Sequence, residues 1–367
     1  MAASRIRLRN LWFKVHKWLG ILLALLVVPI SLSGAALVWH DWLDAQINPH
    51  RYEVSGEASL PPSAYAAAAA RALEPGERIA TVTMPHGEGP VVVSAARPPV
   101  QGGGRPVRTM VWLDPADARV LDRAGSNEGA VRFLHVLHGS LMIPGSGRQI
   151  VGWVGVAMLV SALTGLWLWW PLGGGFRRGL RWRRQDSTNA NLHHLGGFWI
   201  ALPLAMLSFT GVWISFPAFF GSLSGAPPQA AQARQGPPPR PLERPRLSPD
   251  AALAAARPHS TGALVSIAWP TDRSPKWTVA FAREGGNAEV KVEDSSALAE
   301  PPQPPRPETT ARTMRRWHDG TGMGPVWQAV IFLGGIVPAL LAATGIIMWL
   351  RTRRWRGDVA KRKSTRA

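Results

Sequence analysis

Four long apolar runs divide the chain, at residues 18–40, 150–171, 195–220 and 327–350. A helix needs about 20 apolar residues to cross roughly 30 Å of hydrocarbon, and each run has that length or more. The pattern therefore predicts four transmembrane helices. The first run is too long for a cleaved signal peptide and has no small-residue cleavage site directly after it, so we interpret it as a retained span.

Two longer polar segments, residues 41–149 and 221–326, show the same order of patterns. In each, an Ala-rich helix pattern precedes short runs of alternating apolar and polar residues, which are typical of strands. The first segment has a predicted helix at 63–73 and predicted strands at 80–84, 90–94 and 109–115. The second has a helix from the cap residue Ser248 to Ala256, then strands at 264–269, 276–281 and 288–292. Pro-rich tracts at 224–246 and 300–308 are interpreted as linkers.

The basic residues predict an orientation. The formal net charge is +18, and residues 1–17, 172–192 and 351–367 hold five, five and eight of the 41 Lys and Arg residues. Basic residues beside apolar runs are typical of the cytoplasmic side, so we expect both termini in the cytoplasm and both polar segments in the periplasm. A basic face on a soluble domain, which nucleic-acid binding would need, is not apparent in the sequence.

The chain contains no cysteine, which excludes thiolate-bound iron–sulfur clusters, c-type haem attachment and thiol catalysis.

The predicted fold is a membrane-embedded all-α four-helix bundle with two small α+β periplasmic lobes. In chain order we expect a cytoplasmic N-terminus with the first helix (1–40), the first lobe (41–149), the second helix (150–171), a basic loop (172–194), the third helix (195–220), the second lobe (221–326), the fourth helix (327–350) and a basic tail (351–367).

The two halves of the chain repeat one spacing of histidine and glycine. His16 stands 18 residues before Gly34, as His193 stands before Gly211. His138 stands 27 residues before Gly165, as His318 stands before Gly345. A small hydroxyl residue precedes every one of these glycines: Ser33, Thr164, Thr210 and Thr344. We interpret this repetition as an internal duplication.

A parallel duplication relates its halves by an axis along the membrane normal, so equivalent residues face one another. His16 would face His193 on the cytoplasmic side, and His138 would face His318 on the periplasmic side. Two histidines on opposite faces of one plane are the usual ligands of a six-coordinate haem in a helical bundle. The hypothesis is therefore two b-type haems with these four axial ligands. Zinc, copper or a proton relay through the histidines are the alternatives, although structural zinc normally takes four closely placed ligands.

Other residues near the histidines have possible roles. The Ser–Gly and Thr–Gly pairs are expected to allow close approach of helices or of a flat macrocycle. Basic side chains are candidates to hold haem propionates by charge-assisted hydrogen bonds: Arg132, Arg148, Arg315 and Arg316 outside, and Lys17 inside. His40, His135 and His194 have no counterpart in the repeat, and any of them could replace a predicted ligand.

The histidine segments together resemble one known family over nearly the whole chain. They read Lys-Val-His-Lys-Trp-Leu-Gly at 14–20, Arg-Phe-Leu-His-Val-Leu-His-Gly at 132–139 and Leu-His-His-Leu-Gly-Gly at 192–197, with Asp114-Pro115 at a strand end. In their order and duplication they are similar to the PepSY-associated transmembrane proteins, which are iron-regulated proteins of the bacterial inner membrane and include siderophore reductases. The resemblance implies PepSY-like lobes, two haem b groups on His16, His193, His138 and His318, and reduction of ferric siderophores in the periplasm. The second lobe departs from the family in its Pro-rich lead-in and in lacking a clear Asp-Pro.

The expected activity is outer-sphere transfer of one electron to Fe³⁺ in a chelate. No dinucleotide-binding or P-loop motif is present in the sequence, so the electron donor is expected to be a quinol or a separate flavoprotein. An iron-chelate permease is an alternative, disfavoured because only four spans are predicted and they lack charged residues. A non-enzymatic periplasmic interaction or protease-modulating protein is another, which leaves the paired histidines unexplained.

Overall fold

The computed structural model describes residues 2–85, 87–98, 107–171, 176–182, 185–224, 238–284, 286–304 and 308–364. The predicted linkers fall partly outside these residues. The chain forms two compact units, described separately below. The helical unit comprises Met1–His40, Phe133–Ala231 and Glu308–Ala367, and the sheet unit comprises Asp41–Arg132 and Gln232–Pro307.

Four long helices make up most of the helical unit: α1 (Ala2–Leu37), α5 (Gly147–Trp169), α7 (Thr188–Ser215) and α12 (Gly324–Ser364). Each contains a stretch long and apolar enough to cross a membrane. Leu25 and Leu202 are 83% and 79% exposed within the unit, as expected for side chains that face lipid. The chain is therefore a membrane protein. α1 and α12 extend beyond the apolar runs at 18–40 and 327–350, because the basic flanking segments continue the helices.

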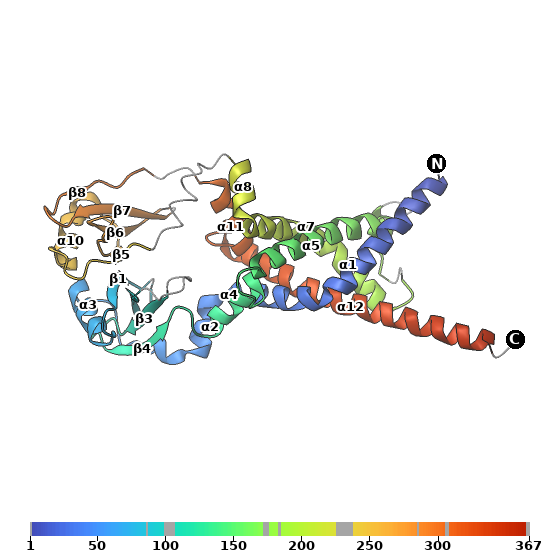
Figure 1. Cartoon of the computed structure of the whole chain (residues 1–367), viewed down its shortest axis with the longest axis horizontal. Coiled ribbons are helices and arrows are strands. Elements are labelled where there is room, and N and C mark those ends of the chain that lie inside the picture. The colour runs from blue at the N-terminus through green and yellow to red at the C-terminus, as the bar shows by residue number, and fades with distance from the viewer. Residues whose placement is uncertain are drawn as a thin grey trace. The chain divides into compact units, whose positions relative to one another are not determined.

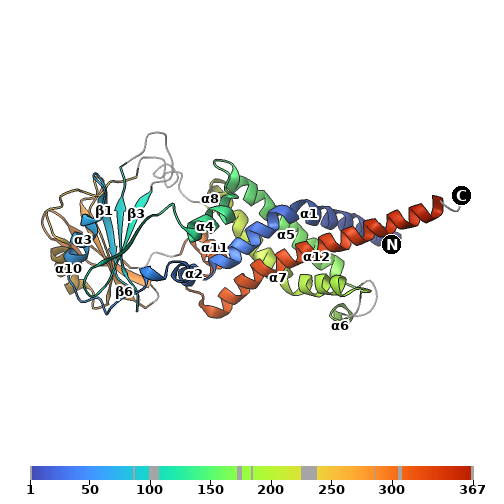
Figure 2. The same cartoon turned by 90° about the horizontal axis from the view of Figure 1, so that it is seen from below.

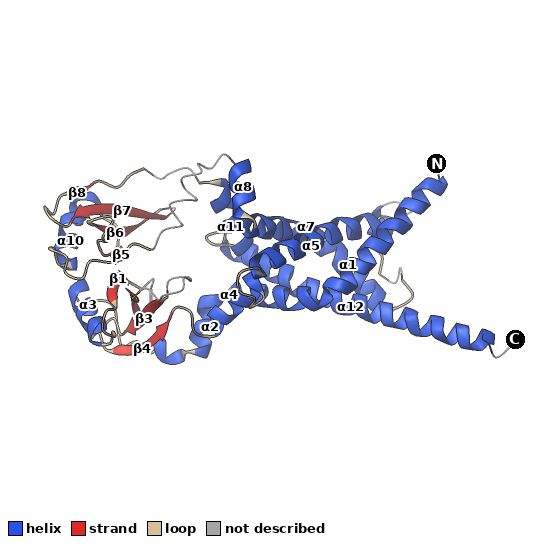
Figure 3. Ribbon diagram, viewed as in Figure 1, coloured by secondary structure: helices blue, strands red, loops and turns tan. Residues whose placement is uncertain are grey.

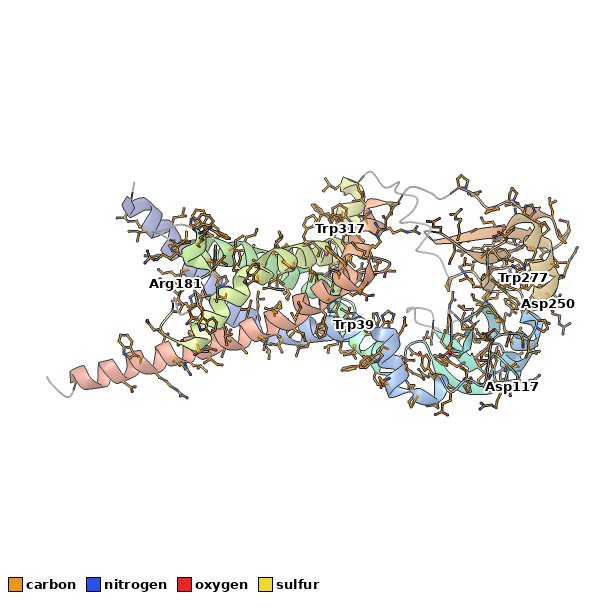
Figure 4. All side chains as sticks on the ribbon, turned by 180° about the vertical axis from the view of Figure 1, so that it is seen from behind. Trp39, Asp117, Arg181, Asp250, Trp277 and Trp317 are labelled. Atoms are coloured by element: carbon orange, nitrogen blue, oxygen red, sulfur yellow. The ribbon has the colours of Figure 1, made fainter. Side chains whose placement is uncertain are left out.

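The four helices pack as a bundle in which each contacts two neighbours: α1 packs on α5 and α12, and α7 packs on α5 and α12. Both termini lie at the same end of this unit (Figure 1). Two short helices, α4 (Ala130–Ser140) and α11 (Thr310–Asp319), lie at the other end (Figures 1 and 2). Trp39 and Trp317 also lie at that end, whereas Arg181 lies at the end near the termini (Figure 4).

α4 and α11 pack with the four long helices, so the contact boundaries of the two units differ from the predicted lobe boundaries. The lobes at 41–149 and 221–326 were expected to include them, but from Phe133 and from Glu308 onward the chain belongs to the helical unit. α11 has clear local signals for its ends: the Thr309 side chain accepts a hydrogen bond from the Arg312 N–H, and Gly320 ends the helix with φ of 76°. The smaller helices α6 (Phe176–Gly179) and α8 (Pro217–Leu223) complete the described part of this unit.

The sheet unit contains one antiparallel sheet in the order β4-β3-β2-β1-β5-β6-β7-β8. Its strands are β1 (Arg78–Thr83), β2 (Val91–Ala96), β3 (Arg108–Leu113), β4 (Val120–Gly125), β5 (Leu264–Ala268), β6 (Lys276–Arg283), β7 (Gly286–Glu293) and β8 (Ala299–Glu300). Helices α3 (Pro62–Arg71) and α10 (Pro249–Ala256) precede β1 and β5 (Figure 3). The remaining short helices are α2 (His40–Ile47), η1 (Pro49–Arg51) and η2 (Arg257–His259).

The two predicted lobes are thus halves of one sheet. Each half is a four-stranded meander, and the first strand of each pairs with the other, with Val82 opposite Ile267. An unpaired first strand would leave a row of backbone donors and acceptors exposed, and this pairing satisfies them. The two helices also meet, because the Ser63 N–H donates to Asp250 Oδ1 at 2.9 Å. Trp269 packs against the apolar cores of both halves.

A buried carboxylate closes the turn at the end of β3. Asp114 is fully buried, and it accepts hydrogen bonds from the Ser55 N–H and hydroxyl and from the Ala116 N–H, each at 3.0 Å. The second half has an equivalent that the sequence did not reveal, since no Asp-Pro marks it. Asp294 is 5% exposed there and accepts from the Trp277 Nε1–H at 2.9 Å.

We predict that Asp114→Asn destabilises the sheet unit. Burial alone raises the pKa of Asp114, but its hydrogen bonds and Arg119 together lower that pKa. The carboxylate therefore stabilises the fold above the unfolded-state pKa of about 4, and this contribution is lost as the pH falls through the lower folded-state pKa. An amide would turn an N–H₂ group toward a backbone N–H, at a cost of about 1–3 kcal/mol. Thermal unfolding followed by the strand signal in circular dichroism should show a lower midpoint for Asp114→Asn.

The matched control is Asp117→Asn, in the same turn. Asp117 is exposed and accepts one hydrogen bond, from the Arg119 N–H at 2.8 Å. We expect a smaller change in its unfolding midpoint. Equal midpoints for the two variants would contradict a stabilising role of the buried carboxylate.

Candidate functional site

Two pairs of histidines lie inside the helical unit. In the first pair, His16 of α1 and His193 of α7 have ring centres 6.3 Å apart and ring planes at 80°. In the second pair, His138 of α4 and His318 of α11 have ring centres 5.9 Å apart and planes at 42°. The structure thus brings together the same partners that the repeat predicts, each from a different half of the chain.

These separations suit two imidazoles on one metal ion. An imidazole nitrogen binds a metal at about 2 Å, and it lies about 1 Å from the ring centre, so two axial ligands on opposite sides have ring centres about 6 Å apart. Rings stacked face to face would lie closer, and edge-to-face ring pairs also have centres at this distance. The histidine separations therefore fit the fifth and sixth positions of a haem iron.

Hydrogen bonds orient all four rings through Nδ1. The acceptors lie on the neighbouring helix: Ser161 O (3.1 Å) and Thr164 Oγ1 (3.2 Å) for His16, Thr344 Oγ1 (3.0 Å) for His193, Ile30 O (2.8 Å) for His138, and Leu207 O (3.1 Å) and Thr210 Oγ1 (3.0 Å) for His318. Each threonine hydroxyl donates to a carbonyl of its own helix, so it can only accept from the histidine. Nδ1 therefore carries the proton, and the lone pair that binds a metal is on Nε2.

The repeated glycines give these rings room. A Cβ atom would lie 2.6 Å from His138 Cε1 if added to Gly34, 3.1 Å from His16 Cε1 at Gly165, 3.2 Å from His318 Cε1 at Gly211, and 3.5 Å from His193 Cε1 at Gly345. The sequence analysis assigned the Ser–Gly and Thr–Gly pairs to helix or macrocycle packing. In the structure, a histidine ring from a neighbouring helix lies beside each of these glycines, a contact that the sequence analysis did not predict.

The two pairs are separated along the bundle. His16 is on α1, and His138 meets the same helix at Ile30, which is 14 residues further along. A rise of about 1.5 Å per residue separates the two levels by roughly 20 Å. His193 and Leu207 on α7 repeat the same interval for the second half.

A family model described as the PepSY-associated TM region matches residues 13–352. The chain belongs to this family. The match includes all four candidate histidines and the four glycines opposite them, and it confirms the resemblance found in the sequence. A comparison with curated proteins found no match.

In this PepSY-associated transmembrane protein, a cavity of about 850 Å³ surrounds the first histidine pair. Apolar groups line most of it, including Met158, Trp169 and Phe198. Basic residues also reach the cavity: Arg9, Lys17 and Arg353. A mostly apolar cavity of this size with a few polar groups is typical of a cofactor site. The candidate residue Lys17 thus lines this cavity together with Arg9 and Arg353.

The second pair lies between α4 and α11 in this family member. Burial lowers the pKa of His138, and burial followed by the nearby His138 lowers the pKa of His318 to about 4. Both rings are therefore neutral near pH 7, which is the state that binds iron. Of the predicted propionate partners, Arg132 is on α4, and Arg315 and Arg316 are on α11. Arg316 pairs with Glu308 at 3.1 Å, and Arg148 donates to the Ile214 carbonyl.

The other candidate histidines have different neighbours in this PepSY-associated protein. His194 lines the cavity of the first pair, and its ring centre is 6.0 Å from that of Trp169 at 26° between planes. His40 and His135 lie beside each other, with ring centres 6.0 Å apart and planes at 77°. The structure therefore brings neither His40 nor His135 into the two predicted pairs.

Proposed function

We propose that this protein holds two haem b groups and passes electrons across the bacterial inner membrane to Fe³⁺ in a periplasmic siderophore. The supporting observation is the pair of opposed histidines at each of two levels, with ring separations of 6.3 and 5.9 Å. Every ring has an Nδ1 hydrogen bond to an adjacent helix and a glycine beside it. Structural zinc normally takes four closely placed ligands, whereas each level brings together two histidines.

The residues of the chain fit such a cofactor. His16 and His193 would hold one haem, and His138 and His318 the other. The neighbouring threonines and carbonyls fix the ring orientation and increase the basicity of Nε2. When bound, each haem supplies reversible one-electron chemistry. The apolar lining of the cavity suits the apolar surface of a macrocycle, while Arg9, Lys17 and Arg353 can balance the charge of propionates.

The two levels suggest different partners. The first pair lies toward the end with the basic termini, which we assign to the cytoplasmic side, where a quinol or a separate flavoprotein would donate electrons. The second pair lies toward the end where a ferric siderophore would accept them. One electron converts Fe³⁺ to Fe²⁺, and the hard oxygen ligands of a siderophore hold Fe²⁺ less strongly, so reduction favours iron release.

The visible spectrum of the detergent-purified chain tests this proposal. Reduction with dithionite should give a b-type spectrum, and pyridine haemochrome analysis should give about two haems per chain. Adding a ferric hydroxamate should reoxidise the reduced protein, whereas the matching Ga³⁺ complex, which has the same shape and charge but accepts no electron, should not. A folded but colourless protein from haem-replete cells would refute the proposal and favour an interaction or protease-modulating role.

A further inference from the structure

A third pair of histidines, His40 and His135, lies outside the membrane-spanning stretches. His40 begins α2 directly after α1, and His135 is on α4. Their ring centres are 6.0 Å apart, close to the separations of 6.3 and 5.9 Å in the other two pairs. Unlike those four histidines, which are half-buried, both of these side chains are exposed. This separation is that of an edge-to-face ring pair and also lets one metal ion lie between the two rings, and neither ring is enclosed by the helical unit.

We propose that His40 and His135 bind a divalent first-row transition-metal ion between their imidazoles. His40 Nδ1 lies 3.1 Å from the Leu37 carbonyl, which can only accept, so the metal-binding lone pair of His40 is on Nε2. Imidazole suits ions such as Fe²⁺, Ni²⁺, Cu²⁺ and Zn²⁺, and the exposed position leaves room for water molecules to complete the coordination. Among the described residues no group of three or more His, Cys, Asp or Glu side chains forms a metal site, so the ion would have two protein ligands.

The position of this pair suggests what it is for. His135 and His138 are three residues apart on α4 and therefore lie on one face of the helix. His40 follows Gly34, the glycine that contacts His138, by six residues. The third pair is thus next to the second pair. If the proposed function holds, Fe²⁺ leaves its chelate near this point. Imidazole nitrogens are better ligands for Fe²⁺ than for Fe³⁺, so the third pair would receive the reduced ion; this role rests on the proposed function.

Exposure argues against a third haem at this position. A macrocycle between His40 and His135 would have much of its apolar surface uncovered by the protein, whereas the first pair opens into an apolar cavity. A hydrated metal ion needs no such cavity. The observations therefore favour an ion over a macrocycle.

Calorimetric titration with Zn²⁺ tests the site on the full chain, purified without a polyhistidine tag. Zn²⁺ is the probe because it has no redox chemistry. We expect one site in the unmodified protein, with affinity reduced at least about tenfold in His40→Ala and in His135→Ala, and no further loss in the double variant. The control is His259→Ala, which removes an exposed histidine of the sheet unit and should leave binding unchanged.

Haem content, measured on the same preparations, separates this inference from the proposed function. Retention of both haems in His40→Ala and His135→Ala, together with loss of Zn²⁺ binding, supports a separate metal site. Loss of a haem in either variant would overturn the inference, because these histidines would then be haem ligands. Unchanged Zn²⁺ affinity in both variants would overturn it as well. A colourless protein that binds Zn²⁺ through His40 and His135 would support the metal site while refuting the haem proposal.

Discussion

Replacing His318 by alanine should remove one of the two haems and leave the other in place. Of the other three predicted ligands, His318 faces His138. The first pair lies roughly 20 Å away along the bundle. His16→Ala should remove the other haem in the same way. Pyridine haemochrome analysis should therefore give about one haem per chain for each variant, against about two for the unmodified protein.

Double variants make this prediction sharper, because they test the pairing itself. Removing both members of a pair, as in His16→Ala with His193→Ala, should cost no more haem than removing one. Removing one member of each pair, as in His16→Ala with His318→Ala, should cost both haems. Loss of both haems in a variant that keeps one pair intact would contradict two independent sites, provided that circular dichroism shows normal helix content.

Replacing Gly34 by alanine should disturb the second haem through a single added methyl group. The new Cβ would lie 2.6 Å from His138 Cε1 and 2.9 Å from Nδ1. Both distances are shorter than a van der Waals contact. The His138 ring would have to move and lengthen its 2.8 Å hydrogen bond to the Ile30 carbonyl. Overpacking of this kind costs about 1–3 kcal/mol, which corresponds to roughly 5- to 150-fold weaker haem retention. The reduced spectrum should lose or shift one of its two components.

Gly345→Ala is the matched control, since it makes the same change at the equivalent position of the other pair. Its Cβ would lie 3.5 Å from His193 Cε1, which is an ordinary contact. Alanine is also about 1 kcal/mol more favourable than glycine inside a helix, so both variants gain the same stabilisation from helix propensity. We expect Gly345→Ala to keep two haems with an unchanged spectrum. Equal losses in both variants would contradict the view that Gly34 makes room for the His138 ring.

The two candidate sites have a common design that joins the halves of the chain. Every pair takes one histidine from each half, and each histidine packs against a Ser–Gly or Thr–Gly pair of its own half. A group bound between the members of a pair would therefore link the halves. Ligand binding of this kind stabilises the folded state in proportion to the logarithm of ligand concentration, so the bundle should be more stable with its cofactors than without them.

Much of the local structure could be predicted from the sequence, because its signals are local. The apolar runs predicted the four membrane helices, and the α10 cap at Ser248 was confirmed by its hydrogen bond from the Ala251 N–H. Most strands were predicted as well, since alternation along a strand reflects burial of one face. β4 was missed because Val120, Leu121 and Asp122 follow no such alternation, and they pair at the edge of the sheet.

The choice of histidine partners was also determined by the sequence, because one repeat of spacing related four residues to one axis. The tertiary structure alone decided the rest. It joined the two lobes through β1 and β5, placed α4 and α11 in the helical unit, and brought His135 beside His40. It also showed that the small residues admit imidazole rings. These contacts join segments far apart in the chain, often more than 100 residues, and no periodicity or cap in one segment specifies which distant surface it will meet.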